Sequence, residues 1–181
     1  DIQVITPMHK GDIGTRKLNA MLQAVLNPPG DKEIADNLQL RVGDKVMQVR
    51  NNYDKEVFNG DVGRIVKIEK EGHLVVVKFP GREVTYENEE VGDLTIAYAI
   101  SVHKSQGSEY PAVVIPLHTT HYPMLQRNLL YTAVTRAKRF VFIVGTHRAI
   151  AISVRNDRMN ERCSGLAEKL KRAAINKKII M

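Results

Sequence analysis

The sequence lacks the cysteine pairs that build disulfide frameworks and cysteine-based metal sites, and it lacks the long apolar runs that span membranes. Among 181 residues there is one cysteine and no tryptophan. The lone Cys163 excludes an internal disulfide and any zinc cluster made of cysteines, and an unpaired thiol suits a reducing cytoplasm. No apolar run approaches the roughly 20 residues that span a bilayer. We therefore expect a cytoplasmic protein without a membrane partner.

The sequence also lacks a phosphate-binding loop of the form Gly-x-x-x-x-Gly-Lys-Ser/Thr. Its nearest string, residues 11–17, has Arg16 where the second glycine must stand. No Asp-Glu pair follows an apolar strand as a magnesium-holding pair would, and no histidine spacing is typical of metal ligands. We therefore expect no metal site, and we do not expect the chain by itself to hydrolyse ATP.

The composition is that of a globular protein with an excess of positive charge. Hydrophobic residues make up 43% and charged residues 26%, and the net charge is +7 with a pI near 9.5. This charge favours a polyanionic partner such as nucleic acid, although many globular proteins are mildly basic without binding DNA. Residues 155–178 hold eight Lys or Arg against three Asp or Glu. A DNA-facing stretch and a solvated helix face explain that excess equally well.

The first forty residues are typical of an α/β protein. Residues 1–6 lack an initiator Met and the basic and apolar regions of a signal peptide. They have the character of a strand, so we expect a fragment of a longer protein. Leu18, Met21, Leu22 and Val25 then follow at the spacing of an amphipathic helix. The Asn-Pro-Pro-Gly string at 27–30 ends this helix.

Between residues 40 and 92 the pattern changes to short β-branched strands. Asn-Gly, Glu-Gly and Pro-Gly pairs separate them at hairpin spacing, without a helical pattern. About fifty residues of this kind predict a small β-barrel. We therefore predict an SH3-like insert at 40–92 within an α/β domain formed by 1–39 and 93–181.

After the insert the α/β pattern resumes. We predict a strand at 94–99, a short helical turn at 102–106 capped by Ser101, and strands buried on both faces at 112–117 and 140–144. Helices are predicted at 126–138, from about 145 onward, and at 164–174. The fold class is thus a parallel sheet flanked by helices and interrupted by a β-barrel.

Two segments have the composition of anion-binding sites. Residues 101–109 place hydroxyls, an imidazole, an ammonium and a glycine in the turn after a strand, where α/β sheets commonly bind ligands. A polar loop that caps a helix is an equally good interpretation. Residues 131–139 place Arg136 near a helix end, where it could reach a phosphate bound by another domain. Taken alone, this segment is better explained as a basic turn that complements the helix dipole.

A third segment, residues 6–12, offers His9 or Lys10 to a phosphate after the first strand. On its pattern alone a polar loop is the better interpretation.

Taken together, these segments resemble the C-terminal core of superfamily 1 helicases, and more closely the RecD-like (RecD/TraA) branch. Residues 97–109 resemble helicase motif V, 130–138 resemble motif VI, and 5–11 resemble motif IV more loosely. Residues 42–63 resemble the SH3-like insert of RecD-type enzymes. The segments occur in the family's order and cover nearly the whole chain to about Thr146.

The resemblance implies a second RecA-like motor domain of an ATP-dependent 5′→3′ DNA helicase, of the exodeoxyribonuclease V alpha-subunit type. Arg136 would be the arginine finger, and Gly107, Glu109 and Lys10 would face the nucleotide. Single-stranded DNA would contact the motif V side chains Ser101, His103, Lys104 and Ser105. ATP and Mg²⁺ would be held mainly by an N-terminal motor domain of the same protein. The parent fits either a stand-alone enzyme or a subunit of a recombination nuclease complex.

Two other interpretations remain open. In one, the chain is a passive single-stranded nucleic-acid-binding module in which the barrel binds and the α/β part is scaffold. In the other, it is an inactive helicase relative whose motifs persist for the fold. A phosphate loop elsewhere in the full-length protein would favour the helicase over both.

Overall fold

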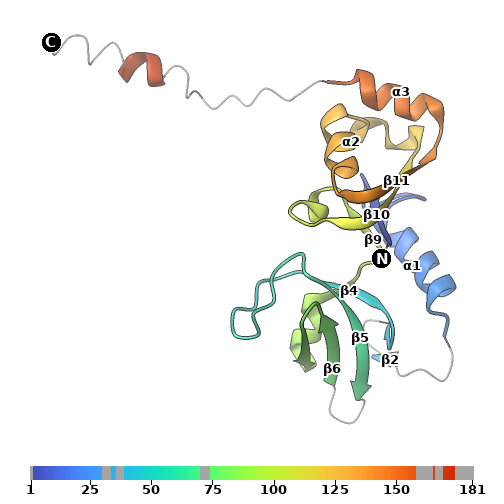
Figure 1. The fold of residues 1–181 in the computed structure, drawn as a ribbon, viewed down its shortest axis with the longest axis vertical. Coiled ribbons are helices and arrows are strands. Elements are labelled where there is room, and N and C mark those ends of the chain that lie inside the picture. Colours follow the sequence, from blue (N-terminus) through green and yellow to red (C-terminus); the bar gives the residue numbers. More distant parts are fainter. Residues whose placement is uncertain are drawn as a thin grey trace.

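Two sheets form the frame of the protein in a computed structural model that describes residues 2–29, 34–35, 39–69, 74–157, 165 and 169–173 (Figure 1). The parallel sheet has the strand order β11-β10-β1-β9, and the larger antiparallel sheet has the order β7-β6-β5-β4-β8. The expected parallel sheet interrupted by an all-β insert is therefore confirmed.

The parallel sheet is built from distant parts of the chain. Its strands are β1 (Ile2–Thr6), β9 (Ala99–Ser101), β10 (Tyr110–Leu117) and β11 (Ala137–Gly145). The helices of this part are α1 (Thr15–Leu26), α2 (Arg127–Val134) and α3 (His147–Arg155), with the 3₁₀ helices η2 (His103–Ser105) and η3 (Thr119–Met124). Ile5, Val113 and Ile115 pack with Ala133 of α2 in the core on one face of this sheet.

The insert is an antiparallel sheet around its own apolar core. Its strands are β4 (Lys45–Gln48), β5 (Val62–Glu69), β6 (Leu74–Phe79), β7 (Arg82–Glu87) and β8 (Leu94–Ile96), with the 3₁₀ helix η1 (Asn88–Asp93) before β8. A two-stranded pair, β2 (Ile34–Ala35) with β3 (Leu40–Arg41), precedes it. Alternate strand residues such as Val46, Ile65, Val75 and Val77 fill the core.

The single strand predicted at 94–99 is wrong. Residues 94–96 form β8, which pairs with β4 of the insert, whereas Ala99 begins β9 of the parallel sheet. The chain therefore changes sheets at Ala97 and Tyr98, and the antiparallel pairing continues to Ile96. A continuous β-rich run does not reveal such a change because both halves have the same composition.

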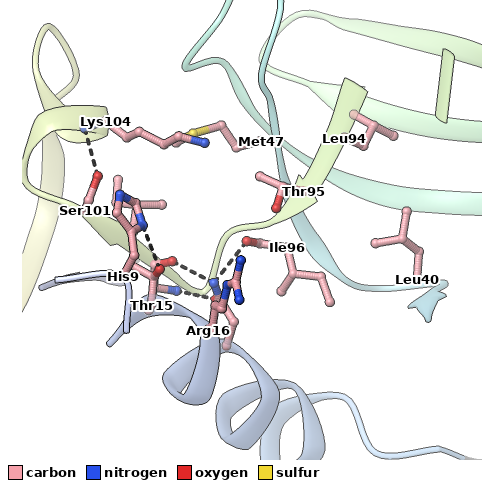
Figure 2. Close-up of a pocket in the computed structure, with 13 residues that line it drawn as sticks. His9, Thr15, Arg16, Leu40, Met47, Leu94, Thr95, Ile96, Ser101 and Lys104 are labelled. Atoms are coloured by element: carbon pink, nitrogen blue, oxygen red, sulfur yellow. Dashed lines mark hydrogen bonds between the residues drawn. The ribbon is translucent and has the colours of Figure 1, made fainter. Parts of the chain in front are cut away.

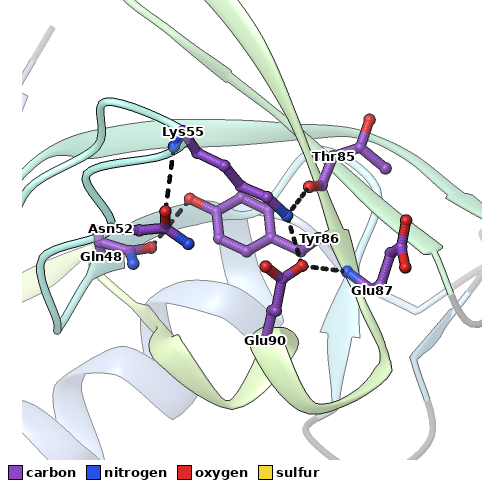
Figure 3. A network of polar contacts seen from close by, with 7 residues as sticks. All are labelled: Gln48, Asn52, Lys55, Thr85, Tyr86, Glu87 and Glu90. Atoms are coloured by element: carbon purple, nitrogen blue, oxygen red, sulfur yellow. Dashed lines mark hydrogen bonds and ion pairs between the residues drawn. The ribbon is translucent and has the colours of Figure 1, made fainter.

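A polar network, buried at Tyr86 and Gln48 and partly exposed at Lys55 and Glu90, fixes the long β4–β5 loop to the rest of the insert (Figure 3). The Tyr86 hydroxyl donates to Gln48 Oε1 at 2.9 Å, and burial raises the pKa of this phenol. Lys55 donates to the carbonyl of Thr85 at 2.7 Å and pairs with Glu90 of η1. The loop is thus held to β7 and η1 through the side chain of Lys55.

Helix α1 forms as predicted, but its apolar stripe does not face the protein core. Met21 and Val25 are exposed, and Leu18 and Leu22 are half-buried. The inward face is polar: Asn19, Gln23 and Asn27 follow one another at helical spacing. Asn19 bonds the backbone of Ala99, at 2.7 and 2.8 Å. The sequence pattern gave the helix correctly, and it did not give the face that packs.

The prediction that β11 is buried on both faces is wrong. Every residue from Lys138 to Gly145 is exposed, in contrast to its neighbour β10, which is largely buried. The cause is position: β11 lies at the edge of the sheet, and its apolar composition matches that of a central strand. Figure 1 shows α2 and α3 beside β11, with α1 at β9.

The remaining differences between the predicted and the observed elements lie at the ends of helices. Helix α2 ends at Val134 rather than at 138, and β11 begins at Ala137, so Arg136 lies in the turn between them. Helix α3 begins near residue 145, as predicted, and Thr146 caps it by accepting from the Ala149 N–H at 3.2 Å. Residues 169–173 are helical, and the rest of the helix predicted at 164–174 lies almost wholly outside the described residues. No helix in the described ranges is long and apolar enough to cross a membrane.

Asp44 joins the insert to the α/β part. Its side chain is fully buried and accepts four hydrogen bonds: from Gln23 at 2.6 Å, Asn27 at 2.7 Å, the Arg41 N–H at 2.8 Å and the Tyr98 hydroxyl at 3.0 Å. Burial, and then the Asp44 charge, raises the pKa of Tyr98 to about 12. One carboxylate therefore connects α1, the β3–β4 turn and the crossing between the two sheets.

We predict that Asp44→Ala lowers the free energy of unfolding by on the order of 3 kcal/mol, because several buried donors would lose their acceptor. Urea denaturation of the two proteins measures the difference. Asp12→Ala is the control, since Asp12 is exposed and pairs only with exposed Lys17. Equal stability of wild type and Asp44→Ala would contradict this role.

Candidate nucleic-acid cleft and nucleotide edge

A cleft of about 400 Å³ lies where α1, β8, β9 and η2 meet (Figure 2). Most of its polar lining comes from the loop after β1 and the first turns of α1, and from the end of β9. The lining residues are His9, Thr15, Arg16, Asn19, Leu40, Met47, Leu94, Thr95, Ile96, Ala99, Ile100, Ser101 and Lys104. The cleft thus joins the motif IV and motif V segments, which are ninety residues apart in sequence.

The lining of the cleft carries positive charge without a carboxylate that would neutralise it. Arg16 and Lys104 are exposed, and neither forms an ion pair with any described residue. No Asp or Glu lines the cleft. In Figure 2, Lys104 enters from η2 and Arg16 from α1, with His9 between them and bonded to Thr15 at 3.1 Å. Two free cations with hydroxyl and imidazole donors suit phosphate oxygens.

The turn at residues 102–109 is shaped by its own serines. The predicted turn is the shorter 3₁₀ helix η2, whose N-cap is Val102; the Ser101 hydroxyl still accepts from the Lys104 N–H at 3.3 Å. Ser105 is fully buried and donates to the Val102 carbonyl at 2.7 Å. Gly107 has φ +86°, which a glycine adopts without strain. Of the four residues predicted to contact DNA, Ser101 and Lys104 line the cleft and His103 is exposed beside it, whereas Ser105 faces inward.

The Arg136 guanidinium is held against the far end of the same turn. Nη1 donates to the Ser108 carbonyl at 3.2 Å, Nε to the Thr132 carbonyl at 3.2 Å and Nη2 to the Thr135 hydroxyl at 3.3 Å. Glu109 pairs with Lys138 at 3.3 Å. The structure therefore brings Arg136 together with Glu109 and the segment that follows Gly107.

The cationic cleft and the Arg136 cluster lie at opposite ends of the parallel strands, which we call the carboxyl edge and the amino edge of the sheet. Ser101 pairs with Thr6 at the carboxyl end of β1, whereas Tyr110 pairs with Ala137 at the amino end of β11. The turn therefore carries the chain from the carboxyl edge to the amino edge. Lys10 follows β1 at the carboxyl edge, on the side of the cleft, while Arg136 precedes β11 at the amino edge.

Arg16 and Thr95 are among the cleft residues that sequence reasoning missed. Arg16 was considered only as the residue that breaks a phosphate loop, yet it stands in the first turn of a helix that follows a strand, where anions are favoured. Thr95 stands in β8, which the sequence did not separate from β9. His9 was an alternative to Lys10 as a phosphate contact, and of the two only His9 lines the cleft.

Lys45 lies at the junction of the two sheets. Its ammonium donates to the Ile2 carbonyl at 3.2 Å and stands 5.8 Å from the centre of the Tyr110 ring. Burial, and then the nearby charge of Arg64, lowers the pKa of Lys45 to about 8. This cation therefore touches β10 directly after the motif V turn.

Comparisons with known proteins agree with this architecture. Residues 18–79 match the family described as ATP-dependent RecD-like DNA helicase SH3 domain, and residues 96–144 match UvrD-like helicase C-terminal domain. The Pif1 helicase from Bacteroides, solved with ADP-AlF3 and ssDNA, has a similar fold, with a TM-score of 0.63 and 24% identity over 97% of this chain and 46% of that one. These matches define the C-terminal region of a superfamily 1 helicase.

Within that class the chain belongs to the RecD-like helicases, and its all-β insert is their SH3-like domain. It is 42% identical to the ATP-dependent RecD2 DNA helicase of Deinococcus radiodurans over 171 residues, and 32% identical to the RecBCD enzyme subunit RecD of Mycolicibacterium smegmatis over 134 residues. These matches cover 94% and 74% of this chain. The chain spans about a quarter of each relative, 23% in both cases.

We predict that the free energy of unfolding rises between pH 8 and pH 10 and that Lys45→Met removes this rise. Unfolding returns the Lys45 ammonium to water, where its pKa has the ordinary value of 10.5. The unfolded chain then binds more protons than the folded chain above pH 8, so stability increases with pH.

Urea denaturation at the two pH values measures this rise. Lys17→Met is the control, because Lys17 is exposed and should leave the rise in place. The same rise in Lys45→Met as in wild type would contradict the prediction.

Proposed function

We propose that this chain is the C-terminal motor half of an ATP-dependent 5′→3′ DNA helicase. It supplies an arginine finger, Arg136, and part of a track for single-stranded DNA. An N-terminal motor domain of the same protein supplies the phosphate loop and the magnesium site, and the chain alone does not hydrolyse ATP. The single observation that carries this proposal is the turn at 102–109, which joins the cationic cleft to the Arg136 cluster.

The DNA side of the proposal rests on the cleft. Arg16 and Lys104 are exposed cations without carboxylate partners, and Ser101, Thr95 and His9 add neutral hydrogen-bonding groups. Such groups bind the backbone of a nucleic acid, so binding is sequence-independent and sensitive to salt. The Bacteroides Pif1 structure of similar fold was solved with ssDNA.

The nucleotide side rests on Arg136. Its guanidinium is half-buried and bonded to neutral oxygens only, so its charge is available to an anion at the amino edge of the sheet. Gly107 and Glu109 stand nearby, and we assign Lys10 only a peripheral role because it follows β1 at the other edge. Within the described residues no group of three His, Cys, Asp or Glu could hold a metal ion. ATP, when bound by the other domain, supplies the phosphoryl group whose transfer drives the cycle.

The geometry suggests how the two sides are coupled. In this proposal Arg136 exchanges its bond to the Ser108 carbonyl for a phosphate oxygen outside this domain. That carbonyl belongs to the turn whose other end presents Lys104 to the cleft. Engagement of Arg136 therefore alters the turn that holds the DNA backbone, and release restores it. Alternate tightening and loosening of backbone contacts becomes a step along the strand.

The proposed partners follow from the same sites. Single-stranded DNA occupies the cleft, and the N-terminal motor domain of the same protein approaches Arg136. Several similar proteins are named as subunits of the RecBCD enzyme, so we include other subunits of a recombination nuclease complex as partners of the full-length protein.

We predict that Arg136→Ala in the full-length protein lowers DNA-stimulated ATP hydrolysis by about 10³-fold, since loss of an arginine finger removes a charge that stabilises the transition state. Steady-state ATPase assays with single-stranded DNA measure the rate. Arg139→Ala is the matched control, because Arg139 is exposed and stands over the Phe140 ring rather than in the Arg136 cluster.

Two results would overturn parts of this proposal. Near wild-type hydrolysis by Arg136→Ala would show that the finger is wrongly assigned. Absence of DNA-stimulated hydrolysis in wild-type full-length protein would favour an inactive relative or a passive binding module.

We predict that Lys104→Ala and Arg16→Ala each weaken binding of single-stranded DNA and reduce the slope of log K against log salt by about 0.7, the share of one phosphate contact. Fluorescence anisotropy of a labelled oligonucleotide at several salt concentrations measures the slope. Lys17→Ala neighbours Arg16 but lies outside the cleft lining and should leave the slope unchanged. Equal slopes for all four proteins would place the DNA elsewhere.

A further inference from the structure

Tyr110 contacts the backbone of Arg136 at the start of β10. It is the first residue of this strand and directly follows the turn at 102–109. Its N–H donates to the Arg136 carbonyl at 2.8 Å. The residue is only 9% exposed. Tyr110 is therefore a buried aromatic residue bonded directly to the backbone of the proposed arginine finger.

The Tyr110 ring lies in a core to which both parts of the protein contribute. Met47 of β4 belongs to the same apolar cluster, and Val62 of β5 packs against that cluster. The ammonium of Lys45, also in β4, stands 5.8 Å from the centre of the ring, within the range of a cation–π contact. The insert therefore contacts the side chain of the residue whose backbone holds Arg136.

The bond from Tyr110 fixes the backbone of Arg136, whereas the bonds of the guanidinium fix only its side chain. Nη1 donates to the Ser108 carbonyl at 3.2 Å, and in the proposed cycle this bond is exchanged for one to a phosphate oxygen. The Tyr110 bond lies where the pairing of β10 with β11 begins, at Tyr110 and Ala137. It does not have to break when the guanidinium moves. The Tyr110 backbone thus sets the point from which the Arg136 side chain reaches outward.

The strand ladder alone holds the backbone of Tyr110 weakly. The next residue, Pro111, has no N–H to donate to the ladder, and the register of β10 against β11 shifts between Tyr110 and Ala112. Such irregularities disrupt the ladder locally. On the other side, Gly107 bends the chain three residues before Tyr110. The contacts of the buried ring therefore supply what the ladder lacks at this position.

We infer that Tyr110 is a positioning residue for Arg136, and that the insert holds Tyr110 in place through Lys45. The inference rests on the proposed function, because it assumes that Arg136 acts on a phosphate bound by another domain. It gives the insert a role at the nucleotide edge, away from the cationic cleft. A misplacement of a catalytic group by about 1 Å costs on the order of 10²-fold in rate, so a small shift of Tyr110 has a measurable effect.

The test compares Tyr110→Leu with Tyr110→Phe in the full-length protein. Leucine keeps the position apolar but removes the ring that Lys45 contacts, whereas phenylalanine keeps the ring. We expect kcat for DNA-stimulated ATP hydrolysis to fall on the order of 10- to 100-fold in Tyr110→Leu. The KM for ATP and the affinity for single-stranded DNA should change little, because the weakened interaction is made in the transition state. Tyr110→Phe should restore kcat. A wild-type kcat in Tyr110→Leu, or an equal loss in both variants, would overturn the inference.

A double-mutant cycle separates the positioning of Arg136 from a general loss of packing. On an Arg136→Ala background there is no guanidinium to position, so Tyr110→Leu should lower kcat by less than about two-fold further. If Tyr110→Leu lowers kcat by the same factor with and without Arg136, its role is structural and the inference is wrong. A near wild-type kcat of Arg136→Ala itself would instead contradict the proposed function, so the two failures are distinguishable.

Lys45→Met tests the contribution of the insert without disturbing the Tyr110 side chain. We expect kcat to fall by roughly two- to five-fold, as the loss of one cation–π contact implies. Lys45→Arg keeps a cation and should restore kcat. Lys78→Met is the matched control, because Lys78 is exposed on β6 of the insert and pairs with exposed Glu83. The same kcat in Lys45→Met and Lys78→Met would show that the insert does not hold Tyr110.

Discussion

The buried carboxylate of Asp44 is the constraint on which the arrangement of this protein depends. A charge without access to water is tolerated only when hydrogen bonds replace its hydration. Four donors do so here, and they come from α1, the β3–β4 turn and the crossing residue Tyr98. The insert and the α/β part are therefore held in one register by polar groups, since a hydrophobic contact alone would allow sliding.

This constraint explains the unusual orientation of α1. To reach Asp44, Gln23 and Asn27 must point inward, and Asn19 on the same side bonds to the start of β9. The apolar stripe of the helix is then turned away from the core, so that Met21 and Val25 are exposed and Leu18 and Leu22 are only half-buried. The polar junction and the exposed apolar stripe are two consequences of one helix orientation. A helix that must satisfy a buried charge on one side can offer its other side to a further element.

Sequence patterns predicted what depends on local chemistry. The β-branched insert, the turn after β9 and the start of α3 all follow from short strings, and the order of the helicase motifs followed from resemblance. The patterns failed where the answer depends on neighbours far along the chain. They could not show that Leu94 and Ala99 belong to different sheets. They also took the apolar residues of β11 and α1 as signs of burial, because periodicity reports which residues share a face and is silent about what covers it.

The candidate site shows the same division. Arg136 and the motif V turn were found from sequence, but the register of the parallel sheet was needed to place them at opposite edges. Because of that placement, the turn at residues 102–109 connects the two sites. Were both groups at one edge, the turn would be a simple loop with two contacts. Because residues 102–109 cross from the edge with Lys104 to the edge with Arg136, a displacement at one end must be taken up along the segment. Buried Ser105 donates to the Val102 carbonyl and closes the carboxyl-edge half of this segment into a tight turn. Gly107, with its positive φ, supplies the bend between that half and Ser108. The turn closed by Ser105 is thus joined through Gly107 to the Ser108 carbonyl, which Arg136 contacts. A second domain at the amino edge is needed to displace Arg136 and, with it, this segment.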